Sequence, residues 1–242
     1  MGALLALEEV SRSFGALRAV NRLSLALQEG EALGILGPNG AGKSTLFNLI
    51  TGHLRPDAGR VLYDGRDITR LPTAERCRLG IGRSFQIPHP FAGMTVFENL
   101  LVGAVFGGGL SERAGATECR RILERTGLTA KANRLAGSLT LLDRKRLELA
   151  RALSTRPRLL LLDEIAGGLT DEESLALTDT ITALRCEGVS LLWIEHVVRA
   201  LLRVVDRLMV IDLGALLREG EPQAVMASRE VREVYMGMDA SA

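Results

Sequence analysis

The sequence predicts an α/β fold with a parallel sheet in its core and a block of helices inserted into it. Leu159–Leu162 is apolar at every position and Ser190–Ile194 at every position after Ser190, which is typical of strands that are buried on both faces of a parallel sheet. A helix separates them, and its start at Thr170-Asp171-Glu172-Glu173 has the spacing of a capping box. Between residues 95 and 154 the pattern is helical with almost no strand signal. Strands that alternate with helices indicate an α/β core.

The first part of the chain carries strand signals and one helix start. We expect strands at Ala3–Ser11, Arg22–Leu27 and Ala32–Leu36, a helix from Lys43, and a hairpin at Val61–Asp67 that turns at Asp64-Gly65.

The second part begins with the helical insertion and returns to strands. Helical periodicity predicts helices at Val96–Val102, Glu112–Thr126 and Arg144–Ser154. After the insertion, we expect a third core strand at Arg207–Ile211. We therefore divide one domain into a core of residues 1–94 and 155–242, with an antiparallel β subdomain, and a helical subdomain of residues 95–154.

Composition excludes several classes of protein. Thirty basic and 29 acidic residues give a net charge of +1, so nothing in the overall charge attracts nucleic acid. Cys77, Cys119 and Cys186 are odd in number and far apart, which argues against disulfides and zinc and favours the cytoplasm. The N-terminus lacks a signal-peptide pattern, and the apolar run Leu100–Leu110 is too short to cross a membrane. If a membrane matters, we expect another chain to cross it.

A phosphate-binding motif follows the strand at Ala32–Leu36. The residues are Gly37-Pro38-Asn39-Gly40-Ala41-Gly42-Lys43-Ser44, which match the P-loop pattern in its required place between a strand and a helix. Its glycines let successive amides face one anion, Lys43 can neutralise β- and γ-phosphate oxygens, and Ser44 can bind Mg²⁺. The motif predicts binding of a nucleoside triphosphate.

An acidic pair, Asp163-Glu164, ends the leucine-rich strand. In open α/β sheets ligands bind outside the carboxyl ends of the strands, so we expect both side chains on the ligand side. Asp163 is then a candidate for holding Mg²⁺ through water, and Glu164 for orienting and deprotonating the attacking water. The competing interpretation is that the pair caps the next helix.

Together these residues resemble the nucleotide-binding subunits of ABC transporters, from about Leu4 to Gly237. The family's phosphate loop is present in full and continues to Thr45. The resemblance implies that Gln86 contacts Mg²⁺ and the attacking water, that His196 contacts the γ-phosphate, and that Phe14 stacks on adenine. It also implies a P-loop NTPase core with an ATPase activity, and ATP and Mg²⁺ as cofactors.

A closer resemblance is to the branched-chain amino-acid uptake subgroup. It rests on the segments 14–20, 85–86, 94–100 and 234–237. It implies a peripheral subunit on the cytoplasmic face of the inner membrane that couples ATP hydrolysis to import of branched-chain or related amino acids. The implied partners are permease subunits, a second ABC ATPase and, indirectly, a periplasmic binding protein.

The sequence departs from the family at its signature segment. Leu139-Thr140-Leu141-Leu142-Asp143 stands where the family usually has Leu-Ser-Gly-Gly-Gln or Leu-Ser-Tyr-Gly-Gln, and the helix that follows keeps the family pattern. Leu142 replaces a glycine that allows close approach, and Asp143 places a negative charge near an anion. We therefore expect a weak contribution to the partner's ATP site, which would make the dimer's two sites unequal. The adjacent Arg144-Lys145-Arg146 is interpreted as a solvated helix start.

Three alternatives stay open at this point. The cargo could be urea, short amides or an exported lipid; the chain could be a regulatory subunit with weak hydrolysis; or it could be a soluble ABC-type ATPase that acts on nucleic acid or ribosomes. The sequence does not specify the direction of transport or whether the partner ATPase is a copy of this chain.

Overall fold

The structure, a computed structural model, describes residues 2–239, with side chains described through Val234. The chain divides into two compact units. The first contains the residues up to Thr73 and those from Leu192 onward, and the second runs from Ala74 to Leu191. Each unit is described by itself.

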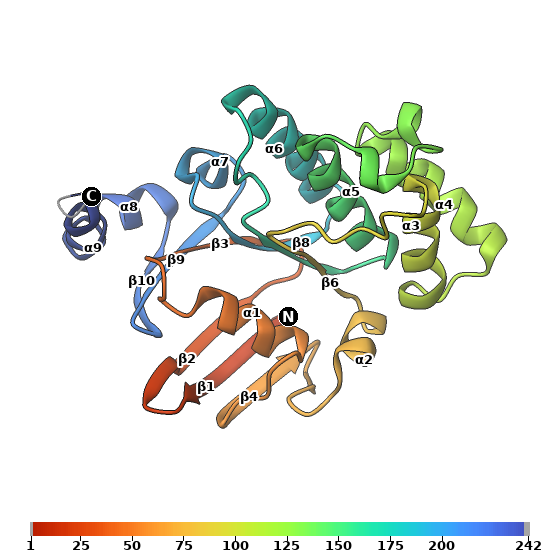
Figure 1. The fold of residues 1–242 in the computed structure, drawn as a ribbon. Helices are drawn as coiled ribbons and strands as arrows, with labels where there is room; N and C mark the ends of the chain where they lie inside the picture. The colour runs from red at the N-terminus through yellow and green to blue at the C-terminus, as the bar shows by residue number, and fades with distance from the viewer. Residues whose placement is uncertain (1, 240–242) are drawn as a thin grey trace. The chain divides into compact units, whose positions relative to one another are not determined.

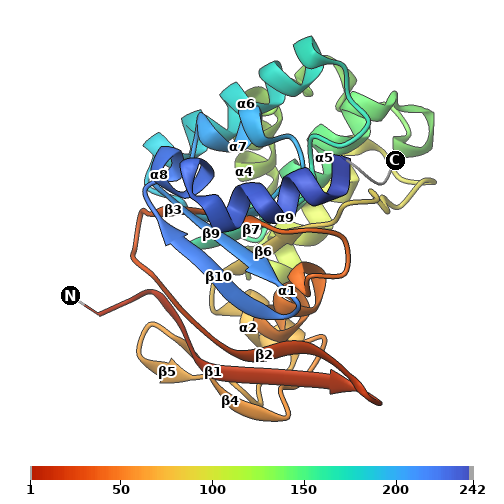
Figure 2. The same ribbon diagram turned by 90° about the vertical axis from the view of Figure 1, so that its left-hand side faces the viewer.

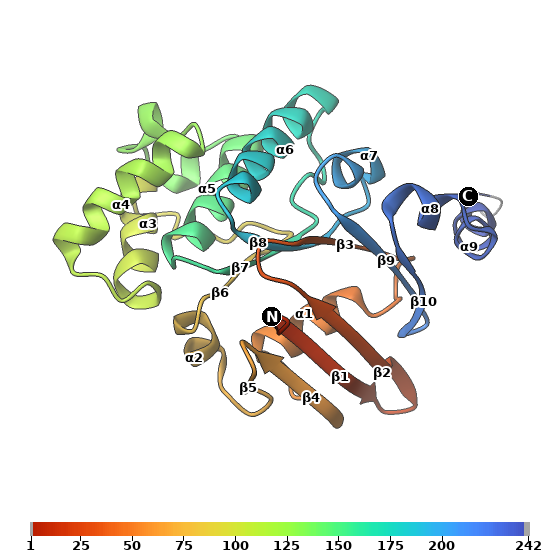
Figure 3. The same ribbon diagram turned by 180° about the vertical axis from the view of Figure 1, so that it is seen from behind.

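The first unit contains an antiparallel sheet with the strand order β2-β1-β4-β5. Figure 3 shows its strands side by side: β1 (Leu5–Phe14), β2 (Leu17–Leu27), β4 (Ala58–Tyr63) and β5 (Arg66–Asp67). The predicted hairpin is confirmed, because Asp64 and Gly65 form its turn with positive φ angles of 50° and 74°. β1 and β2 extend beyond the predicted strands and pair as far as Phe14 and Leu17.

The first unit also contains parallel strands that lead into the phosphate motif. β3 (Ala32–Leu36) is buried throughout and pairs in parallel with β9 (Arg207–Asp212), which pairs in turn with the antiparallel β10 (Ala215–Gly220). Helix α1 (Lys43–Thr51) begins at the predicted residue. The unit is completed by α7 (Val198–Leu202), α8 (Pro222–Ala227) and α9 (Arg229–Asp239), and Figure 2 shows α9 alongside β10.

The second unit contains the acidic strand and its neighbour. After α2 (Thr73–Arg78), strand β6 (Ile81–Ser84) pairs in parallel with β7 (Leu159–Asp163), which is buried throughout as predicted. Helix α6 (Asp171–Cys186) starts with the predicted capping box of Thr170 and Glu173. β8 (Ser190–Ile194) is also fully buried, and its residues fall on both sides of the boundary between the units.

The segment from 95 to 154 lies within the second unit and is helical. It contains α3 (Val96–Val102), which continues into a π-helical turn at Gly103–Gly107, then α4 (Glu112–Arg125) and α5 (Leu141–Ser154). Two short 3₁₀ turns, Thr129–Lys131 and Ala136–Ser138, lead to α5. The three α-helices pack on one another (Figure 1). The predicted helices are confirmed, and α5 begins three residues before the predicted Arg144. The subdomain boundaries stay a prediction.

The three cysteines are free thiols, and Cys119 is fully buried. Burial raises the pKa of Cys119 to about 11, so this thiol is protonated at neutral pH. Among the helices that lie within residues 2–239, none combines the length and the apolar character needed to cross a bilayer.

Candidate active site

The phosphate motif forms a tight loop between β3 and α1. Gly42 is the N-cap of α1 with φ of 99°, and a Cβ there would lie 2.1 Å from the carbonyl oxygen of Ala19. A Cβ on Gly37 would lie 2.3 Å from the carbonyl oxygen of Ile211. Only glycine fits at these two positions, so the loop path depends on both residues.

Lys43 fills the centre of this loop. Its side chain is 6% exposed, and the ammonium donates hydrogen bonds to the carbonyl oxygens of Gly37 at 2.6 Å and Pro38 at 2.9 Å. The N-terminal turn of α1 starts at the same residue, and the helix dipole adds partial positive charge there. Ser44 is exposed beside Lys43. The arrangement concentrates positive charge and leaves a hydroxyl accessible, which suits a phosphate anion.

Gly214, which the sequence analysis did not single out, supports this loop through backbone contacts. Gly214 lies in the turn between β9 and β10 with φ of 79°, and its amide donates to the carbonyl of Ala41 at 3.1 Å. Its own carbonyl accepts from the amide of Asn21 at 2.8 Å, and a Cβ on Gly214 would lie 2.7 Å from the Ala19 oxygen. In the sequence, the Leu213-Gly214 dipeptide after a strand was the available indication of a turn.

Phe14 offers an aromatic ring at the end of β1. The side chain is 45% exposed, and the guanidinium of Arg12 lies 5.1 Å from the ring centroid. Asp57 holds that guanidinium through an ion pair of 2.8 Å. An exposed ring of this kind can stack on a base.

His196 follows β8 on an exposed turn of the first unit. Its backbone amide donates to the carboxylate of Glu195 at 2.9 Å, and the amide of Val197 donates to the same oxygen at 3.4 Å. Glu195 is 1% exposed. This buried carboxylate orders the turn that presents the histidine, and sequence reasoning did not single it out.

In the second unit Asp163 ends β7 next to a buried arginine. Arg83 of β6 pairs with the Asp163 carboxylate at 2.7 Å, and both side chains are almost fully buried. Pairing offsets the cost of burying either charge. Arg83 also lies 4.8 Å from the ring centroid of Phe85.

The structure brings Glu164 and Gln86 together. The amide nitrogen of Gln86 donates to the carboxylate of Glu164, which is partly exposed. Glu164 has φ of 45°, the left-handed region that a non-glycine residue adopts at a cost of roughly 1–3 kcal/mol. Two residues assigned to the attacking water are therefore in direct contact.

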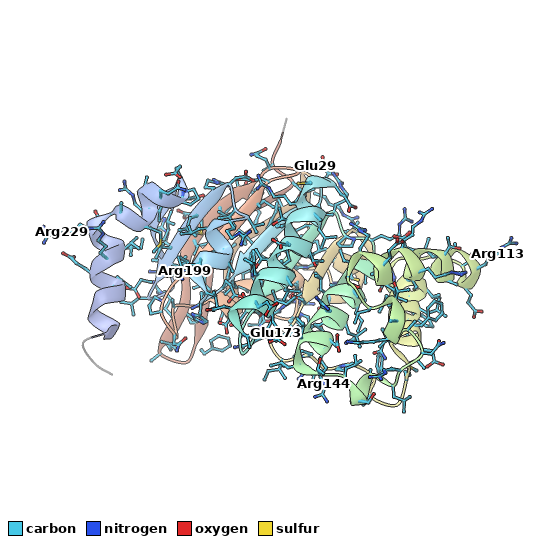
Figure 4. The ribbon with its side chains drawn as sticks, turned by 90° about the horizontal axis from the view of Figure 1, so that it is seen from above. Glu29, Arg113, Arg144, Glu173, Arg199 and Arg229 are labelled. Atoms are coloured by element: carbon cyan, nitrogen blue, oxygen red, sulfur yellow. The ribbon has the colours of Figure 1, made fainter. Side chains whose placement is uncertain are left out.

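The interpretation of Arg144-Lys145-Arg146 as a solvated helix start is wrong for Lys145. This side chain is only 4% exposed, and its ammonium donates to the carbonyl oxygens of Gln86 at 2.8 Å and Glu164 at 3.2 Å. Arg144, labelled in Figure 4 at the beginning of α5, is exposed and donates to the carbonyl of Gly137 at 3.0 Å. Position 145 lies on the side of α5 that contacts the backbones of Gln86 and Glu164.

The altered signature segment is held by its own side chains. Thr140 caps α5 by accepting from the amide of Asp143 at 3.3 Å, and its hydroxyl donates to the Asp143 carboxylate at 2.9 Å. Lys131 also pairs with this carboxylate at 2.5 Å. Burial alone would raise the pKa of Asp143, but the hydrogen bonds from Lys131 and Thr140, together with the positive charges of Lys131 and Arg146, outweigh it, and the pKa is lowered. The negative charge that the sequence places at Asp143 is therefore paired with Lys131.

Comparisons with known proteins show which family the chain belongs to. The ABC transporter family model matches residues 20–167. BraF of Pseudomonas aeruginosa, a high-affinity branched-chain amino acid transport ATP-binding protein, is 38% identical over 97% of this chain and 98% of its own length. The ADP conformation of an ATP-binding cassette is 34% identical with a TM-score of 0.90, covering 98% of this chain and 100% of that one.

A dimeric cassette solved after hydrolysis with ADP and Pi is 26% identical with a TM-score of 0.79, covering 90% of this chain and 98% of that one. The match to the family model spans more than half of the 242 residues. The fold is that of an ATP-binding cassette, and proteins of this kind hydrolyse ATP to drive transport. This chain is therefore an ATP-binding subunit and an ATPase of the ABC transporter family.

Proposed function

We propose that this chain drives the import of branched-chain or related amino acids from the cytoplasmic face of the inner membrane. Permease subunits carry the cargo, and a periplasmic binding protein delivers it to them. The observation that carries this proposal is the 38% identity to BraF over nearly the full length of both chains. Urea, short amides or an exported lipid are the alternative cargoes.

Residues of the first unit bind the nucleotide in this proposal. The loop Gly37-Pro38-Asn39-Gly40-Ala41-Gly42 surrounds the phosphates with backbone amides. Lys43 leaves its carbonyl partners to neutralise β- and γ-phosphate oxygens, Ser44 and Thr45 extend the contacts into α1, and Phe14 stacks on the adenine. His196 contacts the γ-phosphate from its exposed turn.

Oxygen donors of the chain hold Mg²⁺ and the attacking water. Ser44, Gln86 and Asp163 supply hydroxyl, amide and carboxylate oxygens, the donor set that Mg²⁺ prefers. The ion, when bound, neutralises the phosphate charge. Glu164 accepts the proton of the water, and its hydrogen bond to Gln86 orients the carboxylate for this task.

Two ATPase subunits work as a dimer, as in the solved post-hydrolysis cassette. ATP binds the closed dimer more tightly than the open one and so shifts the equilibrium toward closure. The partner is either a copy of this chain or a sister subunit.

Calorimetry with Mg-ATP on the purified chain tests the binding step. We expect heat of binding for the wild type and a large loss of affinity for Lys43→Ala, because the ammonium at the loop centre is removed. No heat from the wild type, with no effect of the substitution, would refute the nucleotide site.

Uptake assays test the cargo. Deleting the gene for this chain in its host should abolish high-affinity uptake of labelled leucine, isoleucine and valine, and a plasmid copy should restore it. Unchanged leucine uptake with lost uptake of urea or amides would assign the alternative cargo.

The signature segment favours a second candidate, a regulatory subunit with weak hydrolysis. Leu141 is 47% exposed in the first turn of α5, and Leu142, at the position of a family glycine, is partly exposed beside it. ATPase assays with and without the membrane subunits decide between the two, since a regulatory subunit stays slow in both.

A further inference from the structure

We infer that Lys145 is a positioning residue for hydrolysis, because it ties the turn that carries Glu164 to the loop that carries Gln86. This inference rests on the proposed roles of Glu164 and Gln86 and adds a residue that those roles do not include. It requires only contacts within the second unit.

The ammonium of Lys145 joins two backbone segments. It donates to the carbonyl oxygen of Gln86 at 2.8 Å and to that of Glu164 at 3.2 Å. The two segments are 78 residues apart in sequence, and their side chains also meet, through the Gln86–Glu164 hydrogen bond. A charge-assisted hydrogen bond to each of the two backbone carbonyls therefore fixes the positions of the Gln86 and Glu164 side chains relative to each other.

The burial of Lys145 indicates that this arrangement is specific. A lysine side chain is ordinarily solvated, and burying an ammonium is costly unless hydrogen bonds compensate. Here the relative exposure of the residue is only 4%. Glu164 adds a second indication, since its left-handed backbone, with φ of 45°, must be held by surrounding contacts, and the bond from Lys145 to its carbonyl is one of them.

The same face of α5 holds the Gln86 loop at further points. Glu148 lies three residues after Lys145, and its carboxylate accepts from the amide of Phe85 at 3.4 Å. Arg151, three residues further, donates to the carbonyl of His89 at 2.9 Å and lies 5.1 Å from the ring centroid of Phe91. Spacing of three residues places these side chains along one side of the helix. Lys145 extends this set of contacts to Glu164, through its hydrogen bond to the Glu164 carbonyl oxygen.

Lys145→Met tests the inference, because methionine keeps the length and apolar bulk of the side chain but removes the ammonium. We expect the kcat for ATP hydrolysis by the full chain to fall about 10- to 100-fold, with the KM for ATP and the affinity for Mg-ATP nearly unchanged. Lys145→Arg keeps a donor and should recover part of the kcat. Arg144→Met is the matched control one residue away, and its kcat should stay near that of the wild type.

Hydrogen exchange measures the positioning directly and does not depend on turnover. In Lys145→Met the amides of residues 85–91 and 164–167 should exchange faster than in the wild type, while Arg144→Met should leave them unchanged. If Lys145→Met changed only the melting temperature, with normal kcat and normal exchange in both segments, Lys145 would be a packing residue and the inference would be wrong.

A double-mutant comparison separates this inference from the proposed function. In a Gln86→Ala background, Lys145→Met should lower kcat less than in the wild type, because part of the geometry it maintains is already lost. Equal losses in both backgrounds would contradict the inference. Failure of the wild type to hydrolyse ATP would refute the proposed function instead, and the exchange experiment would still decide the role of Lys145.

Discussion

Glu164 differs from an acidic residue that merely caps a helix. Its backbone is left-handed, its carboxylate accepts from Gln86, and its carbonyl accepts from Lys145. A capping residue instead adopts an extended backbone and accepts from the amides of the following turn, as Thr170 does at the start of α6. The two interpretations that the sequence left open are thus distinguished by backbone geometry, which supports the proposed role as general base.

Glu164→Gln should keep ATP binding and lose nearly all turnover. Glutamine has the same shape but cannot take the proton of the attacking water, and loss of a general base typically costs 10²–10⁴-fold in rate. Calorimetry with Mg-ATP and a phosphate-release assay measure the two properties on one preparation. Turnover near that of the wild type would remove Glu164 from the role of base.

Asp143 gives the stability of the chain a specific dependence on pH. Its pKa is lowered in the folded state, because the hydrogen bonds from Lys131 and Thr140 and the positive charges of Lys131 and Arg146 together outweigh the effect of burial. A lowered pKa stabilises the fold above the unfolded pKa of about 3.9, and this contribution is lost as the pH falls through the lower folded value. The interaction therefore acts in full at neutral pH.

Asp143→Asn should lower the free energy of unfolding at pH 7 by about 1–3 kcal/mol, since a buried charge-assisted bond to Lys131 is removed. The difference from the wild type should shrink as the pH is lowered below about 4, where the carboxylate of the unfolded chain is protonated. Urea unfolding at several pH values measures it. A difference that grows toward acid would show that the sign of the pKa shift is wrong.

At the scale of elements, the phosphate loop depends on Gly42, because the carbonyl oxygen of Ala19 occupies the space that a Cβ would need there. Gly42→Ala should weaken Mg-ATP binding by at least about 10-fold, because its φ of 99° and the Ala19 oxygen at 2.1 Å from the added Cβ force the loop to move. Gly188→Ala is the matched control: its φ is 90°, nothing lies within 4 Å of an added Cβ, and it follows α6 away from the motif. The control should lose stability but keep affinity, and equal losses of affinity would contradict the argument.

Elements with a strong local signal were predictable. The apolar strand Leu159–Leu162, the capping box at Thr170 and the turn at Asp64-Gly65 each carry their physical cause in adjacent residues. β10 and the ends of β1 and β2 were not predicted, because polar and glycine residues interrupt their alternation and only pairing with β9, or with each other, makes them strands.

The site was predictable only where its residues form motifs. Lys43 and the Asp163-Glu164 pair have recognisable spacing, and the resemblance to the family supplied Gln86, His196 and Phe14. Lys145 could not be found this way, because its burial depends on contacts with Gln86 and Glu164, which are distant in sequence. Gly214 and Glu195 were missed for a similar reason, since each acts through backbone contacts that only the fold brings together.

At the scale of the whole molecule, we propose that the altered signature segment weakens the contribution of this chain to the ATP site of a partner ATPase. The Asp143 carboxylate is already paired with Lys131, so its charge does not account for a weak contribution. In this proposal Leu142 is the obstacle, because its side chain occupies the first turn of α5 where glycine in the family allows close backbone approach.

Leu142→Gly should therefore raise ATP turnover of the assembled transporter, whereas Asp143→Gln should not, since the second substitution removes a charge that Lys131 already neutralises. Glycine in the first turn of α5 costs at most about 1 kcal/mol of helix stability, so the variant should fold, and its melting temperature checks this. Turnover is measured with the permease subunits and the partner ATPase present, because the effect acts on the partner's nucleotide. No gain from Leu142→Gly would count against unequal sites, and a gain from Asp143→Gln alone would identify the buried carboxylate as the obstacle after all.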